Sequence, residues 1–465
     1  MKRQSSRREF LRTSSMGFGM LALSGAVQQN LFGNQSPLAP KIPHIAPKAR
    51  SVIFLYMDGG VSQVDSFDPK PQLDKENGQS PKFETDPTVF NNNGNLLKSP
   101  WEFRHYGQSG MPISDLFPHI GSCADDLCMI RSMTALSPNH PNANYALHCG
   151  HVLSGRPSMG AWFSYGLGNL SQNLPSFVVI NGGLMPPGGM QAFGSGFLPA
   201  NHQGSILASK HPVMNNILPR EELSEMQRKK LDYLDSIDRS LFDHYSHADE
   251  IETAIQNYEL AYRMQMEVPE VSDISKESVA TKRLYGMDSP HTDTREYGAQ
   301  CLIARRLVEQ GVRFVELTMP KVAADRWDQH KNLVEGHELN AFTVDQPIAG
   351  LIKDLKARGL LDSTLIVFSG EFGRTPFAQG KNGRDHNPQG FSLWMAGGGV
   401  KGGTIYGATD EYGYRVIENK MDVHDLHANM MHLMGIDHTR LTYRYGGRDV
   451  RLTDVHGEII PEILA

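Results

Sequence analysis

Short apolar runs mark the strands that this sequence predicts. Ser51–Met57 is a continuous apolar run that stops at Asp58-Gly-Gly, and such an uninterrupted run is typical of a strand covered on both faces. Three later segments are also predicted as strands: Val312–Leu317, Thr364–Phe368 and Phe391–Ala396. We therefore expect several buried strands, spread widely along the chain.

Amphipathic helices alternate with these strands. Glu296–Gln310 has its apolar residues near one face and ends before Gly311, and a second helix is expected to open at Pro347 and to end at Gly359, because proline favours the first helical turn and glycine the end. This alternation predicts an α/β fold with a mostly parallel central sheet and helices on both faces. Residues 219–267 lack internal glycine and proline, which predicts a helical insertion.

The amino terminus has the pattern of a twin-arginine export signal. Ser6–Arg12 contains paired arginines followed by Phe and Leu, and Met16–Ala26 is a modest apolar segment, too short to span a bilayer as a stable helix. A basic amphipathic helix is the alternative interpretation. We assign residues 1–45 to a signal and linker and residues 46–465 to one α/β domain. The protein is then expected to be periplasmic or secreted, with the twin-arginine export machinery as a partner.

Composition excludes some partners. The chain has 465 residues and a formal net charge of −6, which gives no electrostatic attraction to nucleic acid. No long apolar segment predicts a membrane span after processing of the signal. The chain has only four cysteines, too few for a disulfide scaffold of this size, although Cys123 and Cys128 could form one bond in an oxidising compartment.

Acidic residues and histidines follow the predicted strands at the end where α/β sheets bind ligands. One strand leads to Asp58 and then Asp65, another to Trp327-Asp-Gln-His330, and a third to Glu371 and later Asp385-His386. Carboxylates with imidazoles suit zinc, manganese or iron, whereas calcium, though possible, is less expected beside histidine. The sequence thus predicts a divalent metal site with the candidate ligands Asp58, Asp65, Asp328, His330, Glu371 and His386.

The stretch Ser369–Pro388 combines glycines with charged residues and has few apolar anchors. Its glycines would let the backbone fold around a metal and an anion. Arg374 and Arg384 are the predicted contacts to phosphate or sulfate oxygens, since guanidinium groups bind such anions in a bidentate manner, and Asp385 is expected to orient a ligand. The plain alternative is a network of arginines and carboxylates that only fixes the loop.

A further polar segment runs from Arg131 to Asn144 and includes two proline–asparagine pairs. A helix that starts near Pro141 would point its amino end toward an anion. An N-capped helix with polar surface residues explains the composition equally well.

Five segments together resemble the family called domain of unknown function 1501. They are GGVSQVDSFDPKP (Gly59–Pro71), WDQH (Trp327–His330), GEFGRTP (Gly370–Pro376), GRDHNP (Gly383–Pro388) and the long segment His424–Gly457. The family comprises exported bacterial proteins placed in the alkaline phosphatase-like, sulfatase-like superfamily. The resemblance covers nearly all of the chain that follows the signal.

This resemblance implies a mononuclear or dinuclear metal site beside a nucleophilic Ser, Thr or modified Cys that attacks phosphorus or sulfur. The metal-binding positions of the superfamily correspond to Asp58, Asp328, His330, Glu371 and His386. His337 is an alternative to His330, because the superfamily commonly separates this Asp and His by three residues. Phe372 stands where a histidine is expected beside the acid.

The nucleophile is left open by the resemblance. The catalytic candidates are Thr134, Ser137, His140 and Arg374, and an activated water could replace a side-chain nucleophile; no Cys-x-Pro-x-Arg motif of the sulfatase type occurs. The expected function is an exported metal-dependent hydrolase of phosphate or sulfate esters, acting on an anionic ester or a sulfated glycan. The alternative is a catalytically inactive sulfatase-like protein that binds glycans or a partner protein.

Overall fold

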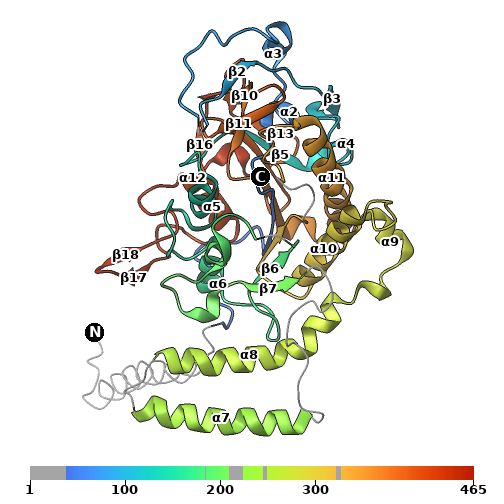
Figure 1. Ribbon diagram of the computed structural model, residues 1–465. Coiled ribbons are helices and arrows are strands. Elements are labelled where there is room, and N and C mark those ends of the chain that lie inside the picture. The colour runs from blue at the N-terminus through green and yellow to red at the C-terminus, as the bar shows by residue number, and fades with distance from the viewer. Residues whose placement is uncertain (1–37, 89, 184, 209–223, 245–248, 321–325) are drawn as a thin grey trace, which may run out of the picture.

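The computed structural model describes residues 38–465 except 89, 184, 209–223, 245–248 and 321–325 (Figure 1). Most of the predicted export signal falls in residues 1–37, outside the described residues. The centre is a nine-stranded sheet in the order β13-β5-β12-β9-β1-β8-β6-β7, with β16 paired to β5. Its strands are β1 (Ser51–Tyr56), β5 (Leu127–Thr134), β6 (Phe177–Asn181), β7 (Ser205–Ala208), β8 (Phe314–Thr318), β9 (Thr364–Ser369), β12 (Phe391–Ala396), β13 (Thr404–Tyr406) and β16 (Met421–Asp422).

Most neighbouring strands of this sheet run parallel. The consecutive strands β9, β1, β8, β6 and β7 are all parallel to one another. β12 is antiparallel to both β9 and β5, so β5 again points in the direction of β1. The parallel strands therefore end at one common edge, and β12 begins there.

Alternate side chains of β1 enter two separate hydrophobic cores. Val52 and Phe54 pack in one core, whereas Ile53 and Leu55 pack in the other, and all four are fully buried. The first core contains α5 (His140–Cys149), α6 (Met159–Leu167) and α12 (Val423–Leu433), and the second contains α4 (Pro118–Gly121), α10 (Thr292–Glu309) and α11 (Leu333–Ala357). Helices thus cover both faces of a mostly parallel sheet, which confirms the predicted fold class.

One predicted helix boundary is wrong. The helix expected to open at Pro347 begins at Leu333, and Pro347 lies inside α11. Proline inside a helix removes a backbone hydrogen bond and costs about 3 kcal/mol. Pro347 is buried, and α11 packs along α10, so tertiary packing outweighs this local cost.

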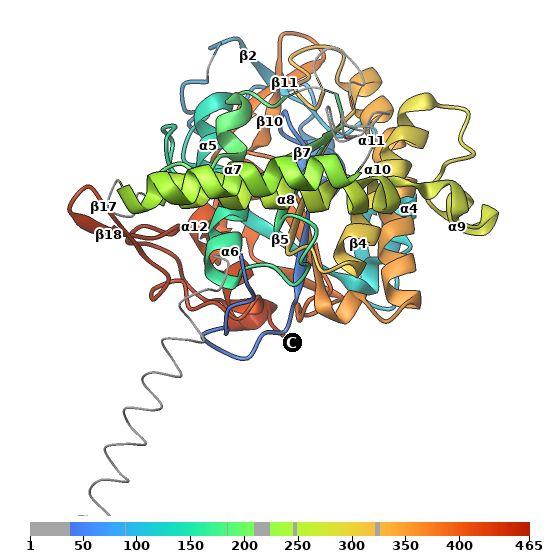
Figure 2. The same ribbon diagram turned by 90° about the horizontal axis from the view of Figure 1, so that it is seen from below.

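Two long helices occupy the segment for which the insertion is predicted. α7 (Ser224–His244) and α8 (Asp249–Ser272) lie side by side at the end of the molecule opposite to β10 and β11, and the view from below shows both running across the body (Figures 1 and 2). An ion pair of 2.9 Å joins Arg228 of α7 to Glu259 of α8. In the part of the chain that the structure describes, no helix is long and apolar enough to cross a bilayer.

Short elements complete the chain. They are α2 (Gln63–Ser66), α3 (Pro71–Lys75), α9 (Val279–Leu284), the pair β3 (Phe103–Tyr106) and β4 (Met111–Ser114), the pair β14 (Ala408–Thr409) and β15 (Val416–Glu418), and the hairpin β17 (Tyr443–Tyr445) and β18 (Arg448–Val450). A smaller sheet has the order β11-β10-β2 and consists of β2 (Asn93–Leu96), β10 (Gly373–Gln379) and β11 (Gly383–Asn387). It lies at the top of the molecule in Figure 1.

The cysteines form no disulfide. All four are free and buried. Cys123 packs in the core that contains α10 and α11, whereas Cys128 packs in the core on the other face. The prediction that these two residues bridge is wrong, because the sheet separates their side chains.

Candidate metal centre

The strand directions bring residues from distant parts of the sequence to one edge of the sheet. β9, β1 and β8 are parallel neighbours, so the segments that follow them, which carry Glu371, Asp58 and Asp328, start from the same edge. β5 points the same way and leads to α5, whose first residue is His140. β12 runs in the opposite direction, so the preceding strand β11, which carries His386, also lies at this edge.

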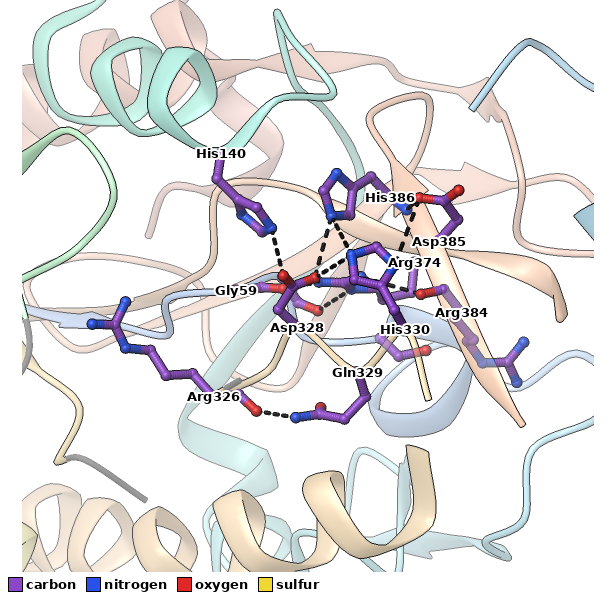
Figure 3. Close-up of polar contacts among 12 residues, drawn as sticks. Gly59, His140, Arg326, Asp328, Gln329, His330, Arg374, Arg384, Asp385 and His386 are labelled. Atoms are coloured by element: carbon purple, nitrogen blue, oxygen red, sulfur yellow. Dashed lines mark hydrogen bonds and ion pairs between the residues drawn. The ribbon is translucent and has the colours of Figure 1, made fainter. Parts of the chain in front are cut away.

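Three imidazoles converge on the carboxylate of Asp328 (Figure 3). Nε2 of His330 and Nε2 of His386 lie 2.9 and 3.2 Å from Asp328 Oδ1. Nε2 of His140 lies 3.1 Å from Asp328 Oδ2. The Nε2 atoms of His330 and His386 are 3.1 Å apart. Two overlapping groups, His140–Asp328–His386 and His330–Asp385–His386, therefore each bring their ligand atoms to within 4.8 Å of one another.

The other ring nitrogen of each histidine is held by an acceptor outside this cluster. Nδ1 of His386 lies 2.6 Å from the Pro138 carbonyl oxygen, and Nδ1 of His140 lies 2.5 Å from Glu371 Oε1. Nδ1 of His330 contacts Gln379 Oε1. We assign the proton to Nδ1 in each ring, because all three partners are acceptors. In each ring Nε2 faces the centre, where it would serve as the metal ligand, as in metal-binding histidines.

The donor set fits a divalent cation. The Nε2 atoms of His330 and His386 lie 3.1 Å apart beside a carboxylate, a spacing at which one cation can bind both nitrogens. Burial, assisted by the nearby Arg374 guanidinium, lowers the pKa of His386 to about 4, so this ring is neutral at neutral pH and can offer a lone pair to a cation. Nitrogen ligands of one tetrahedral zinc lie roughly 3.3 Å apart, close to the spacing seen here. Imidazoles with one carboxylate match zinc, manganese or iron.

Ion pairs also shape the protonation of the cluster. Burial opposes charge on both Asp328 and His140, yet Arg374 and the three histidines hold the pKa of Asp328 well below its usual range. The nearby carboxylates of Asp328 and Glu371 raise the pKa of His140 to about 9 against the effect of burial. His140 is therefore a cation at neutral pH when it binds no metal, and a bound metal would take the place of its Nε2 proton.

Arg374 lies beneath Asp328 and does not reach solvent. Its side chain is fully buried and donates to Asp328 Oδ1 at 2.5 Å, to the Gly60 carbonyl at 3.1 Å and to the Arg384 carbonyl at 3.2 Å, with a further contact to the Gly59 carbonyl. Arg374 is predicted to be catalytic or to bind the substrate anion, but the structure directs its side chain to these partners. The guanidinium instead fixes the carboxylate of Asp328.

Arg384 and Asp65 form a buried pair of their own. Nε and one terminal nitrogen of Arg384 lie 2.6 and 3.0 Å from the two carboxylate oxygens of Asp65, and both side chains are fully buried. Arg384 also donates to the carbonyls of Thr375 and Leu97. Arg384 is predicted as a substrate contact and Asp65 as a metal ligand, but in the structure they bind each other. This pair is the loop-fixing network that the sequence left as an alternative.

Asp58 and Glu371 lie behind the histidines. Glu371 accepts hydrogen bonds from the Gly59 amide at 3.0 Å and from the Tyr56 hydroxyl at 3.2 Å, besides its contact with His140. Asp58 faces the Tyr56 hydroxyl at 3.3 Å and the guanidinium of Arg326. Glu371 thus orients His140 and is not among the donors around Asp328. Asp58 pairs with Arg326 and is likewise outside that group.

The remaining candidates differ in their surroundings. Thr134 Oγ1 donates to the Met421 carbonyl at 3.4 Å, and Ser137 Oγ accepts from the Asn139 amide at 3.1 Å. Within the described chain, neither hydroxyl has a recorded contact with Asp328 or the three histidines. His337 is fully buried, and its Nε2 accepts from the Ser62 amide at 3.3 Å, which removes it as the alternative to His330.

Sequence reasoning missed the groups that orient the histidines. Gln379, Tyr56, Arg326 and the Pro138 carbonyl were not candidates. Tyr56 offered a signal, since it is the polar end of β1 directly before Asp58-Gly-Gly. Gln379 and a backbone carbonyl offered none, because their role depends on the β10–β11 hairpin geometry. Asp385 was expected to orient a ligand, and its Oδ1 accepts from the His386 amide at 2.8 Å.

Comparison with solved structures gives low identities throughout. A sulfatase from Pseudoalteromonas sp., PsFucS1, is 13% identical over 83% of this chain and 68% of its own, with a TM-score of 0.36. A protein of the alkaline phosphatase superfamily from Vibrio parahaemolyticus is 10% identical over 86% and 69%, with a TM-score of 0.37. The alkaline phosphatase of the Antarctic bacterium TAB5 is 9% identical over 85% and 99%, with a TM-score of 0.33.

Comparison of the amino-acid sequence with protein families identifies the family. No curated protein matches the chain. A family model described as protein of unknown function (DUF1501) matches residues 49–464. That match begins just before β1 and includes every residue of the cluster around Asp328. The chain therefore belongs to the DUF1501 family.

Proposed function

We propose that this protein is a metal-dependent hydrolase of phosphate or sulfate esters. Its metal ligands would be Asp328, His140, His330 and His386. The observation that carries the proposal is the convergence of three Nε2 atoms on one carboxylate, each ring being held at Nδ1 by an outer acceptor. Metal sites commonly combine imidazole and carboxylate ligands and hold the second ring nitrogen of each histidine by an outer acceptor.

A bound zinc, manganese or iron ion would act as a Lewis acid on the ester and would make a bound water more acidic. Side chains of the protein would orient the metal ligands. Arg374 holds the carboxylate of Asp328, and Glu371 holds the ring of His140. Asp328 and His330 keep 28% and 24% of their side chains exposed, so this side of the cluster is open to a substrate.

Anion binding is supported by the position of α5. His140 is the first residue of this ten-residue helix, so the positive end of its dipole faces the cluster. The two arginines expected to bind the anion are buried and fully paired. A phosphoryl or sulfuryl group would therefore be held by the metal and the start of α5.

Water is the nucleophile in this proposal, because Thr134 and Ser137 donate or accept elsewhere. Attack of water on phosphorus or sulfur would break the bond to the ester oxygen and release an alcohol with phosphate or sulfate. The same observation favours a second candidate: a sulfatase-like protein that binds an anionic glycan or a partner without turnover.

Metal analysis with an activity assay distinguishes the two. We expect one divalent ion per chain in purified protein and turnover of 4-nitrophenyl phosphate or 4-nitrophenyl sulfate. His386→Ala should lose the ion and the activity yet keep the fold, measured by circular dichroism. Bound metal without turnover of either ester would support the binding candidate, and absence of metal from the wild-type protein would refute both uses of the site.

We further propose that residues 1–45 direct export through the twin-arginine route. Replacing Arg7 and Arg8 together by lysine should retain the protein in the cytoplasm of a bacterial host, as measured by cell fractionation. Export that continues unchanged in the double variant would contradict this assignment.

A further inference from the structure

An exposed aromatic residue stands at the open side of the cluster. Phe90 keeps 57% of its surface exposed, although large apolar side chains are normally buried. Its ring centroid lies 4.8 Å from that of His330 and 6.5 Å from that of His386, with the rings nearly perpendicular. Phe90 therefore contacts the two histidines by one part of its ring and leaves much of the remainder in water.

Two hydrogen bonds join residues on either side of Phe90. Thr88 Oγ1 accepts from the Asn91 amide at 3.1 Å and donates to Asn93 Oδ1 at 2.9 Å. Asn91 adopts a left-handed backbone with φ of 49°, a conformation that asparagine tolerates better than most residues. These contacts define the backbone that follows Phe90.

The same strand that orients His330 also anchors the loop that carries Phe90. β2 follows the loop directly and pairs with β10, where Asn93 lies opposite Gln379, and β2 and β10 are neighbours in Figure 1. Gln379 in turn holds Nδ1 of His330. The position of the Phe90 loop and the orientation of His330 therefore depend on one piece of backbone.

The opening of the cluster faces this ring. Asp328 and His330 are a quarter exposed, whereas His386 and Phe372 are nearly or fully buried. An ester whose anionic group sits at the cluster must direct its organic group toward solvent, hence past His330. Phe90 is an exposed residue on that route, and its ring packs edge-to-face against His330.

We propose that Phe90 is a specificity-determining residue that stacks on a ring in the organic part of the substrate. The inference rests on the proposed function, since it assumes that the anion binds at the Asp328 cluster. The shared chemistry is a ring with an apolar face, either an aryl group or a sugar. A preformed aromatic surface favours such rings over linear groups because it adds contact area at little cost in conformational freedom.

Binding of unreactive anions to metal-loaded protein tests the idea without any turnover. Calorimetry would compare phenylphosphonate with methylphosphonate as the aryl pair, and 6-deoxy-6-sulfoglucose with ethanesulfonate as the sugar pair. We expect the wild type to bind the ring-containing member of at least one pair about 3- to 10-fold more tightly than the linear member, the gain that one aromatic contact provides. Phe90→Ala should abolish this preference and leave the affinity for methylphosphonate unchanged.

Two variants serve as controls. Phe90→Tyr keeps the ring and should retain the preference. Tyr445→Ala removes another aromatic side chain, 55% exposed on the separate hairpin of β17 and β18, and should change neither affinity.

The outcomes separate this inference from the proposed function. An unchanged ring preference in Phe90→Ala, or no preference in the wild type, would overturn the role of Phe90 even if esters are hydrolysed. If no anion of either pair binds, the inference is overturned as well. Ring preference with loss in Phe90→Ala would support it even if every ester tested resists hydrolysis, which would count only against the hydrolase.

Discussion

Replacing Glu371 by glutamine should weaken metal binding without unfolding the protein. The Glu371 side chain is nearly fully buried and lies 2.5 Å from Nδ1 of His140 through Oε1. Glutamine has the same shape and keeps a side-chain oxygen that can accept the hydrogen bond from the Gly59 amide, which is 3.0 Å long in the wild type. The negative charge that holds the His140 ring and raises the basicity of its Nε2 is lost.

The size of the effect follows from the contact that changes. A hydrogen bond to a charged group contributes about 1.5–3 kcal/mol, and loss of a group that orients a metal ligand typically lowers metal affinity about 10- to 100-fold. Since His140 is one of four ligands and the other three are untouched, we expect a value in this range and not complete loss.

Competition with a chromophoric chelator measures the affinity directly. Glu316→Gln is the matched control, because Glu316 is also buried and lies 2.7 Å from Nε2 of His148. His148 sits on α5 like His140, so this variant loosens the same helix without touching the ligand. We expect Glu316→Gln to lower thermal stability and to change metal affinity less than Glu371→Gln does.

Two results would refute the reasoning. Wild-type metal affinity in Glu371→Gln would show that Glu371 does not orient a ligand. Equal losses of metal affinity in the two variants would show that the metal site depends only on the general anchoring of α5. They would contradict a specific role of the His140–Glu371 contact.

Three further outcomes are expected. Gly59→Ala should lower metal occupancy and stability, because Gly59 has φ of +107° and an added Cβ would lie 2.8 Å from the Asp328 amide nitrogen. The control Gly78→Ala, at φ of +79° with open space around it, should lower stability alone. Equal metal content in the two variants would contradict this prediction. Arg384→Met leaves Asp65 buried without its cationic partner and should reduce the free energy of unfolding, measured in urea titrations, by about 3–5 kcal/mol. Adding Asp65→Asn should recover part of this stability, and no recovery would argue against the pair. Burial lowers the pKa of His202 to about 3, below the unfolded value near 6.5, so the unfolded state binds the proton first and stability should fall as the pH drops from about 6.5 toward 3. In urea titrations at pH 7 and 5, His202→Gln should lose less stability than the wild type. Identical losses for the two proteins would contradict this prediction.

The main features of the fold could be predicted because its strands are local signals. β1 and β12 are short apolar runs buried on both faces, and their ends carry turn residues that the sequence shows directly. The start of α11 could not be predicted, because Pro347 looks like a helix opening when only its neighbours are considered. Its tolerance inside the helix depends on packing against α10, which is a tertiary effect.

The candidate site could be predicted in part for a similar reason. Asp328, His330 and His386 follow strand ends or enter strands, so the topology of a parallel sheet places them together. Arg384 and Asp65 carry the same chemistry, yet they pair with each other, and no sequence pattern shows which arginine takes which carboxylate. His140 was a candidate for catalysis, and its place beside Asp328 depends on how the loop after β5 turns into α5.

X-ray absorption spectroscopy at the metal edge tests the central claim most directly. On protein purified with its native metal, we expect one divalent ion with three imidazole nitrogens and carboxylate oxygen in its first coordination shell, and loss of one imidazole in His140→Ala. An ion bound only by oxygen ligands, an unchanged shell in that variant, or no bound ion would contradict a metal centre at Asp328.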